Sequence, residues 1–210
     1  MHNFIEFLKQ RLQANLPGEL AHQKMMATQI GQQFRMNHTT PPRKGGVMIA
    51  LFEEDGKLYF PLTQRPKYDG VHGGQVSLPG GKMEVHDEDL IATAIRETAE
   101  EIGVLITRSQ VIGTLTDLNV TASNFIVSPV VSILEGKPKF NRDPREVDQI
   151  FSAELGHLSH HQTLKETELT VGPNIRLRAP YFDIEEKIVW GATSMILNEF
   201  VALIKEFENE

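Results

Sequence analysis

Cysteine is absent from this 210-residue sequence. Disulfide bonds and thiolate metal sites are therefore excluded, and the composition is typical of a protein of the reducing cytoplasm, where we expect this one to reside. Apolar runs long enough to cross a bilayer are also missing, and the opening segment, MHNFIEFLKQ, lacks the pattern of a signal peptide. We therefore expect neither membrane insertion nor export.

Positive charge is scarce as well. The chain has 21 Lys and Arg against 28 Asp and Glu, which gives a formal net charge of −7. This balance disfavours a broad nucleic-acid-binding surface, but it is compatible with a small phosphorylated ligand held by a few local cations. The expected partner is a small molecule rather than a nucleic acid or a membrane.

Apolar residues make up 40% of the sequence, enough for one sizeable domain with a single core. Two amphipathic segments open the chain, and a polar stretch rich in Pro and Gly, 37–46, follows them. Short apolar strands then alternate with two strong helices, which predicts an α/β domain over residues 41–210 after a helical extension over residues 1–40. The expected helices cover 3–13, 19–34, 89–102 and 192–207, and the expected strands 47–52, 58–63, 75–78, 111–118, 125–134, 147–151, 163–171 and 174–179.

The helix expected over residues 89–102 carries a cluster of glutamates. Glu97, Glu100 and Glu101 stand at i, i+3 and i+4, so their carboxylates share one face. The opposite face is expected to pack inward through Ile91, Ile95, Thr98, Ala99 and Ile102.

Like charges at these spacings repel one another, so the glutamate face is either solvated or occupied by a cation. A hard divalent ion such as Mg²⁺ or Mn²⁺ prefers carboxylate oxygens and would remove the repulsion. The glycine turn Gly80-Gly81 before the helix, Arg96 beside Glu97 and the stop at Gly103 favour the metal site.

Residues 96–104, RETAEEIGV, resemble the second half of the Nudix box, G-x5-E-x7-R-E-U-x-E-E-x-G-U, in which U is apolar. Thr98 departs from the pattern because it occupies an apolar position. Counting back from Arg96, the box glycine falls on Lys82 and the box glutamate on Glu88, so Gly80-Gly81 lies one residue further upstream than in the generic motif. This longer form is similar to the subfamily of Nudix enzymes that cleave coenzyme A.

The segment 61–81, PLTQRPKYDGVHGGQVSLPGG, resembles the signature of coenzyme A pyrophosphatases, roughly L-L-T-x-R-[SA]-x3-R-x3-G-x3-F-P-G-G. The positions in register are Leu62, Thr63, Arg65, Gly74, Pro79, Gly80 and Gly81. The positions that depart from it are Pro61, Pro66, Gly70 and Leu78. Gly70 replaces an arginine that could contact phosphate. Segments 123–131, 146–151 and 188–193 also resemble that subfamily.

The resemblance implies a Nudix fold, a mixed β-sheet sandwiched between helices in an α/β/α arrangement. It also implies hydrolysis of a nucleoside diphosphate linked to another group, in the first place coenzyme A or acyl-CoA to adenosine 3′,5′-bisphosphate and (acyl-)4′-phosphopantetheine. One alternative is ADP-ribose or another nucleotide as the substrate. A second alternative, a catalytically silent ligand-binding module, is disfavoured by the retained glutamates.

In this family water attacks a phosphorus while divalent metal ions neutralise the phosphate oxygens. The resemblance implies that Glu97, Glu100 and Glu101 hold Mg²⁺ or Mn²⁺, with a backbone carbonyl near Gly81 as a further ligand. One of these glutamates, or Glu146 from a later loop, would orient or deprotonate the water; an exposed loop residue is the alternative for Glu146.

Further residues are candidates for supporting roles in such a site. Arg96 is expected to pair with Asp87 or Glu88 and so to orient a glutamate. The candidates for contacts with substrate phosphates, each of which could instead be an ordinary surface residue, are Arg43, Lys44, Arg65, Lys67 and His72. Trp190 either stacks on adenine or simply begins the last helix. The N-terminal extension is a candidate for homodimer contacts or for a lid over the pocket.

Overall fold

The computed structural model describes residues 2–31, 37–68, 73–160, 162–172 and 175–209. Within these ranges the helices are α1 His2–Arg11, α2 Gly18–Gln23, α3 Leu90–Ile102, α4 Leu155–Leu158 and α5 Gly191–Glu208, with a 3₁₀ turn, η1, at Arg108–Gln110. The strands are β1 Thr28–Gln29, β2 Arg43–Glu54, β3 Lys57–Gln64, β4 Val76–Ser77, β5 Gly80–Lys82, β6 Val111–Thr114, β7 Leu118–Val120, β8 Phe125–Ile133, β9 Gln149–Glu154, β10 Leu164–Val171, β11 Ile175–Ile184 and β12 Lys187–Trp190.

Strand β2 is the centre of the larger sheet. It pairs in parallel with β8, from Arg43 opposite Phe125 to Leu51 opposite Ile133, while the other pairings in this sheet are antiparallel. The main path through the sheet is β4-β3-β2-β8-β6. Residues 48–52 of β2 are fully buried, as a continuous apolar run is when both faces of a strand are covered.

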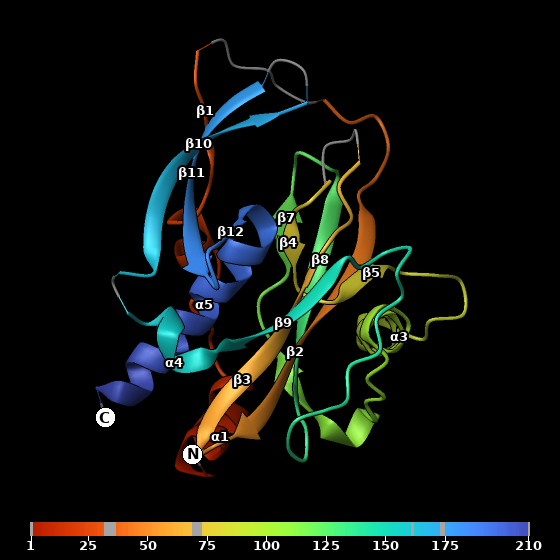
Figure 1. The fold of residues 1–210 in the computed structure, drawn as a ribbon, viewed down its shortest axis with the longest axis vertical. Coiled ribbons are helices and arrows are strands. Elements are labelled where there is room, and N and C mark those ends of the chain that lie inside the picture. Colours follow the sequence, from red (N-terminus) through yellow and green to blue (C-terminus); the bar gives the residue numbers. More distant parts are fainter. Residues whose placement is uncertain (1, 32–36, 69–72, 161, 173–174, 210) are drawn as a thin grey trace.

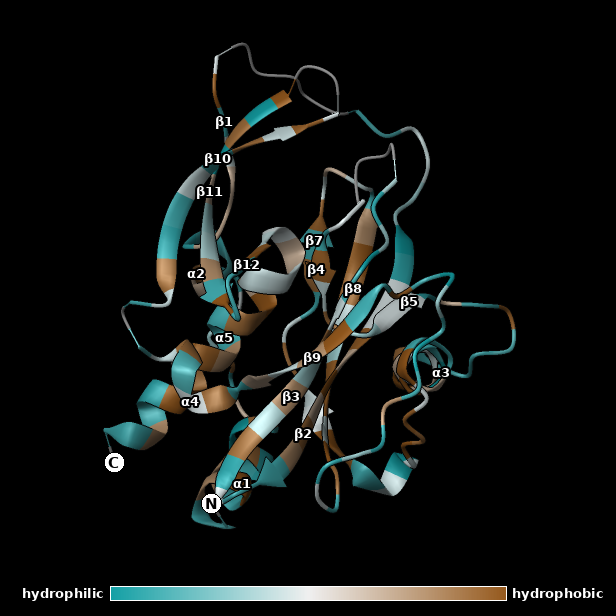
Figure 2. Cartoon of the chain, in the orientation of Figure 1, coloured by the Kyte–Doolittle hydropathy of each residue, from teal (hydrophilic) through white to brown (hydrophobic). Residues whose placement is uncertain are grey.

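The two faces of this sheet are covered by different helices (Figure 1). Met48, Ala50 and Phe52 face α3 and pack with Ala94 and Ile102. The alternate side chains face the other way and pack on α5, and this core includes Ile49, Leu51, Phe60, Leu62, Leu197 and Phe200. Figure 2 shows the hydrophobic sides of α3 and α5 turned toward the sheet. The predicted α/β architecture, a mixed sheet between helices, is confirmed.

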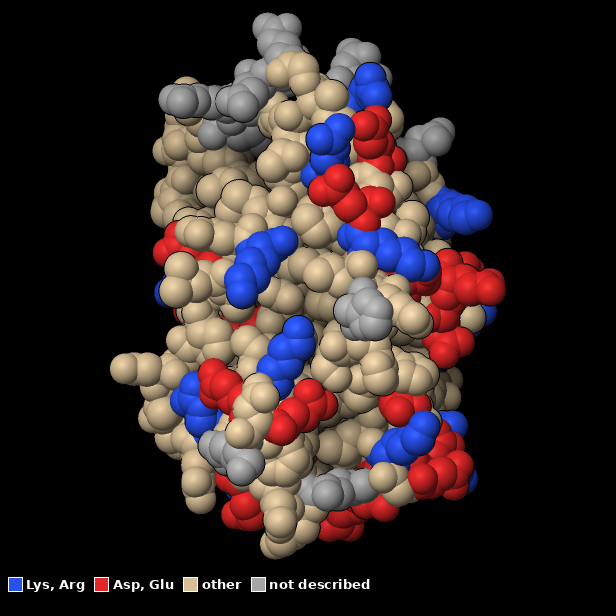
Figure 3. Space-filling view, turned by 90° about the vertical axis from the view of Figure 1, so that its left-hand side faces the viewer, with Lys and Arg blue, Asp and Glu red and all other residues tan. Residues whose placement is uncertain are grey.

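A second, four-stranded sheet stands beside α5. It has the order β1-β11-β10, and β12 also pairs with β11. The strands predicted over 163–171 and 174–179 correspond to β10 and β11, which pair antiparallel, and residues 173–174 between them lie outside the described residues. The face in Figure 3 carries interspersed cations and anions. Ion pairs also link β10 to β11, such as Arg176 with Glu168 at 2.7 Å.

The N-terminal helices pack against α5. Phe4, Leu8 and Met25 belong to the same apolar cluster as α5. The buried carboxylate of Glu199 on α5 accepts hydrogen bonds from the Gly18 N–H at 3.0 Å and the Thr116 hydroxyl at 2.6 Å. His22 Nε2 lies 3.0 Å from the same carboxylate.

Two predicted boundaries are wrong near this region. The helix predicted over 19–34 ends at Gln23, because residues 28–29 pair as strand β1 with Leu177 and Arg178 of β11. Strand β2 starts at Arg43, inside the polar stretch 37–46 and before the predicted start at residue 47, because its pairing with β8 extends to Phe125. In both cases the backbone pairs with a strand that is distant in the sequence, and local sequence patterns do not predict such tertiary pairing. No helix in the described part of the chain is long and apolar enough to cross a membrane.

Candidate active site

Helix α3 is held at both ends by local caps. The side chain of Asp89 accepts a hydrogen bond from the Ala92 N–H at 2.8 Å, and Asp89 also pairs with Arg108. At the other end Gly103 takes the left-handed conformation, with φ of 70°, and its N–H donates to the Ala99 carbonyl. The caps set where the helix begins and ends, and therefore which side chains meet the glycine turn.

Glu101 is the buried member of the glutamate cluster. Its side chain faces the sheet, contrary to the expectation that all three glutamates lie on the open face, and the residue is only 4% exposed. One carboxylate oxygen accepts a hydrogen bond from the Gly80 N–H at 3.2 Å. Burial raises the pKa of Glu101 to about 7, against the opposing effects of this hydrogen bond and of the Arg65 charge.

Glu97 rests on the glycine turn. A Cβ atom added to Gly81 would lie 2.5 Å from the Glu97 carboxylate carbon, so no side chain fits there. Burial raises the pKa of Glu97, and the hydrogen bond from Arg96 opposes that shift. The Gly81 carbonyl oxygen faces β2 and lies close to Gly45, so its predicted role as a metal ligand stays a prediction.

Glu146 joins these two glutamates from a loop more than forty residues further along the chain. The Asn141 N–H donates to the Ile102 carbonyl at 2.8 Å, and the Asp143 N–H donates to the Glu101 carbonyl at 3.0 Å. These bonds satisfy carbonyls that a helix C-terminus otherwise leaves unpaired. The loop is therefore attached to the last turn of α3, and Glu97, Glu101 and Glu146 each place one carboxylate oxygen within 4.8 Å of the others.

Arg96 holds the acidic linker against the helix. Its guanidinium donates to both oxygens of Asp87, at 3.0 and 2.9 Å, and also to Glu97 at 2.8 Å. Of the two carboxylates that the sequence offered as partners for Arg96, Asp87 is therefore the one that pairs with it, whereas Glu88 is exposed. The pKa of Asp87 is strongly lowered, chiefly by the hydrogen bond from Arg96, so this carboxylate stays charged.

Glu100 is not a member of this cluster of three carboxylates. Its side chain is 57% exposed and accepts a hydrogen bond from Arg96 at 2.9 Å. Its charge raises the pKa of Glu97, and its role as a metal ligand also stays a prediction.

The predicted phosphate-binding cations are placed differently from one another. Arg65 follows β3 and lies near enough to Glu101 for its charge to lower the pKa of that carboxyl. Arg43 is already engaged, because its guanidinium stacks 4.3 Å from the Phe125 ring centroid and donates to the Ser123 carbonyl at 3.1 Å. Lys44 and Lys67 are exposed. His72 and Gly70 lie outside the described residues.

The carboxylate cluster fits a hard divalent cation. All its side-chain donors are oxygens, and the charges of Glu97 and Glu146 both raise the pKa of Glu101. A divalent ion would offset this mutual repulsion and keep Glu101 charged. The sequence pointed to Glu146 but gave no sign that Asn141 and Asp143 attach its loop to α3, because they do so through backbone hydrogen bonds.

Comparisons with known proteins bear on the family of this chain. A family model described as NUDIX domain matches residues 42–171. Nudix hydrolase 15, mitochondrial, of Arabidopsis thaliana is 37% identical over 74% of this chain and 56% of its own length, so the chain spans little more than half of that relative. The mitochondrial coenzyme A diphosphatase NUDT8 of Homo sapiens is 30% identical over 85% of this chain and 75% of its own length.

A solved structure shows the same fold. The MutT/nudix family protein from Enterococcus faecalis superposes with a TM-score of 0.57 at 15% identity, covering 84% of this chain and 68% of the other. The family model, the human relative and the shared fold lead to one conclusion. This chain belongs to the Nudix hydrolase family.

Proposed function

We propose that this protein is a metal-dependent pyrophosphatase that cleaves a nucleoside diphosphate linked to another group, with coenzyme A or an acyl-CoA as the substrate. The observation that carries the proposal is the convergence of Glu97, Glu101 and Glu146 within 4.8 Å, from two segments that are distant in sequence. Arg65 adds a cation next to this cluster, as a diphosphate substrate requires.

The three carboxylates would hold Mg²⁺ or Mn²⁺, which when bound neutralises the phosphate oxygens as charge develops on them. We assign the attacking water to Glu146, because it is the exposed member of the cluster. The water oxygen bonds to phosphorus, its proton passes to the carboxylate, and the bridging oxygen leaves with its electron pair. Arg65 would stabilise the negative charge on the phosphates, and Arg96 would keep Glu97 in position through its hydrogen bond.

Two features support coenzyme A as the substrate. One is the similarity of segment 61–81 and of the longer Nudix box to coenzyme A pyrophosphatases. The other is the human relative, whose name describes a coenzyme A diphosphatase and which matches 85% of this chain. The cleavage would release adenosine 3′,5′-bisphosphate and 4′-phosphopantetheine.

The test is turnover by the purified protein with Mn²⁺ or Mg²⁺. We expect chromatography to show both products from coenzyme A, and expect Glu101→Gln to abolish them while the exposed control Glu88→Gln leaves them unchanged. A substrate panel with dephospho-coenzyme A, ADP-ribose and a dinucleoside polyphosphate separates the alternatives. Cleavage of ADP-ribose alone would overturn the substrate assignment, and cleavage of nothing in the panel would overturn the enzyme assignment.

A further inference from the structure

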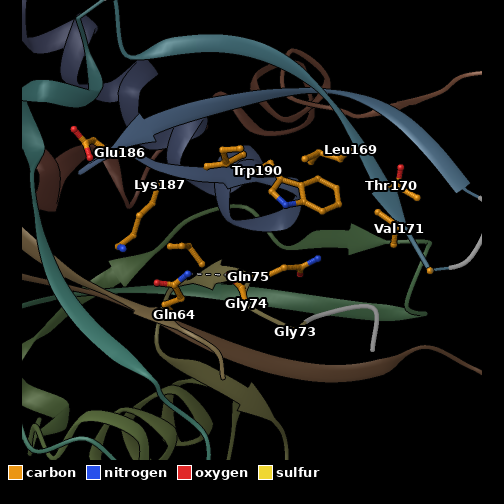
Figure 4. A pocket seen from close by; sticks show the side chains of 13 residues that line it. Gln64, Gly73, Gly74, Gln75, Leu169, Thr170, Val171, Glu186, Lys187 and Trp190 are labelled. Carbon is orange, nitrogen blue, oxygen red and sulfur yellow. Dashed lines mark hydrogen bonds between the residues drawn. The ribbon is translucent and has the colours of Figure 1, made fainter. Parts of the chain in front are cut away.

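A hollow of about 480 Å³ lies between the second sheet and one end of the large sheet (Figure 4). This volume is in the range of small-molecule sites. Its walls come from four places in the chain: the end of β3 at Gln64, the approach to β4 at 73–76, the end of β10 at 169–172, and residues 186–190 around β12.

The aromatic wall of this hollow is Trp190. In Figure 4 its indole lies between the β10 side chains Leu169 and Val171 on one side and Gln75 on the other. Trp190 is fixed by pairing with Tyr181 of β11, and the Thr193 hydroxyl ties the start of α5 to the Val76 carbonyl at 3.4 Å. Because Gly73 and Gly74 line the facing wall without side chains, the space beside the ring suits a flat ligand.

Lys187 brings a positive charge into the same hollow. Figure 4 shows its ammonium group directed toward Gln64. The ammonium lies 5.4 Å from the Phe151 ring centroid, and Lys187 forms no ion pair with any residue that the structure describes. The other charged residue of the lining, Glu186, sits on the β11–β12 turn with φ of 59°, and its carboxylate points away from the ring.

The hollow and the carboxylate cluster meet at the end of β3. Gln64 lines the hollow, while the next residue, Arg65, acts on Glu101 from the other face, as alternating side chains of an extended chain do. The Asp148 N–H donates to the Gln64 carbonyl at 2.8 Å, so the loop that carries Glu146 is attached to the same strand end. The end of β3 therefore contributes to the hollow through Gln64 and to the surroundings of the carboxylates through Arg65.

We propose that this hollow binds the nucleoside half of the substrate, with the purine base stacked on Trp190 and a phosphate that is not cleaved held by Lys187. For coenzyme A this is the 3′-phosphate of the adenosine, so the inference rests on the proposed function and makes its substrate more specific. The pantetheine arm is the poorer occupant, because it is flexible and carries no charge for Lys187. Any base can stack on an aromatic ring, and such stacking contributes substantially to binding.

Trp190 is the only tryptophan in the chain, so its fluorescence reports on this hollow alone. We expect adenosine 3′,5′-bisphosphate to quench it in metal-free buffer, with roughly tenfold tighter binding than adenosine 5′-monophosphate, as one charge-assisted contact provides. 4′-Phosphopantetheine should leave the emission unchanged. Quenching by phosphopantetheine and not by the nucleotides would overturn the proposal, since the arm would then occupy the hollow.

Variants separate the two contacts. Lys187→Met should bring the affinity ratio of the two nucleotides to about one and leave the monophosphate affinity unchanged, whereas the exposed control Lys57→Met should keep the ratio of the wild type. Trp190→Leu should weaken the bisphosphate by about 5- to 150-fold in calorimetry, with an unchanged circular dichroism spectrum as the check on folding. A Lys187→Met protein with the wild-type ratio would refute the phosphate contact.

The outcomes also distinguish this inference from the proposed function. If coenzyme A is not hydrolysed but the bisphosphate quenches Trp190 and Lys187→Met removes its advantage, the binding site stands and the proposed reaction falls. If coenzyme A is hydrolysed while Trp190→Leu leaves its KM unchanged and no nucleotide quenches the fluorescence, the hollow is not the nucleoside site and the proposed reaction stands.

Discussion

The burial of Glu101 predicts that a residue at the centre of the candidate site destabilises the metal-free protein. Its pKa rises from the ordinary 4.5 to about 7, mainly because the side chain is buried. A carboxyl whose pKa is raised by folding favours the folded state most when it is protonated. Its contribution is therefore fully present below pH 4.5, declines as the pH rises toward 7, and is a constant cost above that. With about 1.4 kcal/mol for each tenfold change, the cost at pH 8 is about 3 kcal/mol.

The perturbation that tests this is Glu101→Gln. Glutamine keeps the shape and can still accept the hydrogen bond from the Gly80 N–H, but it carries no charge. In EDTA at pH 8 we expect the variant to be more stable than the wild type by about 3 kcal/mol, a rise in Tm of roughly 6–12 °C for a chain of this size. At pH 4 the two proteins should unfold at nearly the same temperature.

The assay is thermal or urea unfolding followed by circular dichroism between pH 4 and 8. Saturating Mg²⁺ or Mn²⁺ should then make the wild type the more stable protein at pH 8. An ion that binds only the folded state stabilises the wild type, whereas the variant lacks one of the carboxylate ligands for it. Glu88→Gln, which removes an exposed charge from the neighbouring linker, should follow the wild type in every condition. Equal stabilities of wild type and Glu101→Gln at pH 8 in EDTA would refute the reasoning, since the buried carboxylate would then carry no cost.

Three further predictions concern the supports of the site. Gly81→Ala should lower kcat at least tenfold, because the new Cβ would displace the Glu97 carboxylate. The matched control in the same kinetic assay is Gly156→Ala, because a Cβ there would meet only a Glu154 oxygen at 3.6 Å. Asp87→Asn removes the charged partner of Arg96 and should weaken Mn²⁺ binding measured by calorimetry about 10- to 100-fold; unchanged affinity would show that Arg96 orients Glu97 unaided. Glu199→Ala leaves the Gly18 N–H and the Thr116 hydroxyl without their buried acceptor. It should lower the free energy of unfolding in urea by about 3 kcal/mol, and a loss under about 1 kcal/mol would contradict this prediction.

Local signals in the sequence located helix α3 and the chemistry of its face. The helix predicted over 89–102 is observed at Leu90–Ile102. The two agree because the N-cap at Asp89, the stop at Gly103 and the apolar period all lie within one short segment. The glutamate spacing was enough to raise the question of a metal. It was not enough to show that Glu101 is buried, because that depends on the sheet against which the helix packs.

The second predicted helix failed for the opposite reason. Residues 28–29 have no strong strand signal of their own, and they form β1 because β11, about 150 residues further along, offers an open edge. The choice between Asp87 and Glu88 as the partner of Arg96 could not be made from spacing either, since the path of the acidic linker decides which carboxylate reaches the guanidinium.

The sequence by itself determined the family resemblance, the identity of the acidic helix and the residue types that can bind a divalent ion, since all of these are carried by short-range spacing. Only the tertiary structure decided which residues meet. The attachment of the Asn141–Glu146 loop to the last turn of α3 brings Glu146 to Glu97 and Glu101, and the pairing of β12 with β11 places Trp190 beside the end of β3. These contacts join segments that are far apart in the chain, and hydrogen bonds between backbones, which any residue can make, hold them together.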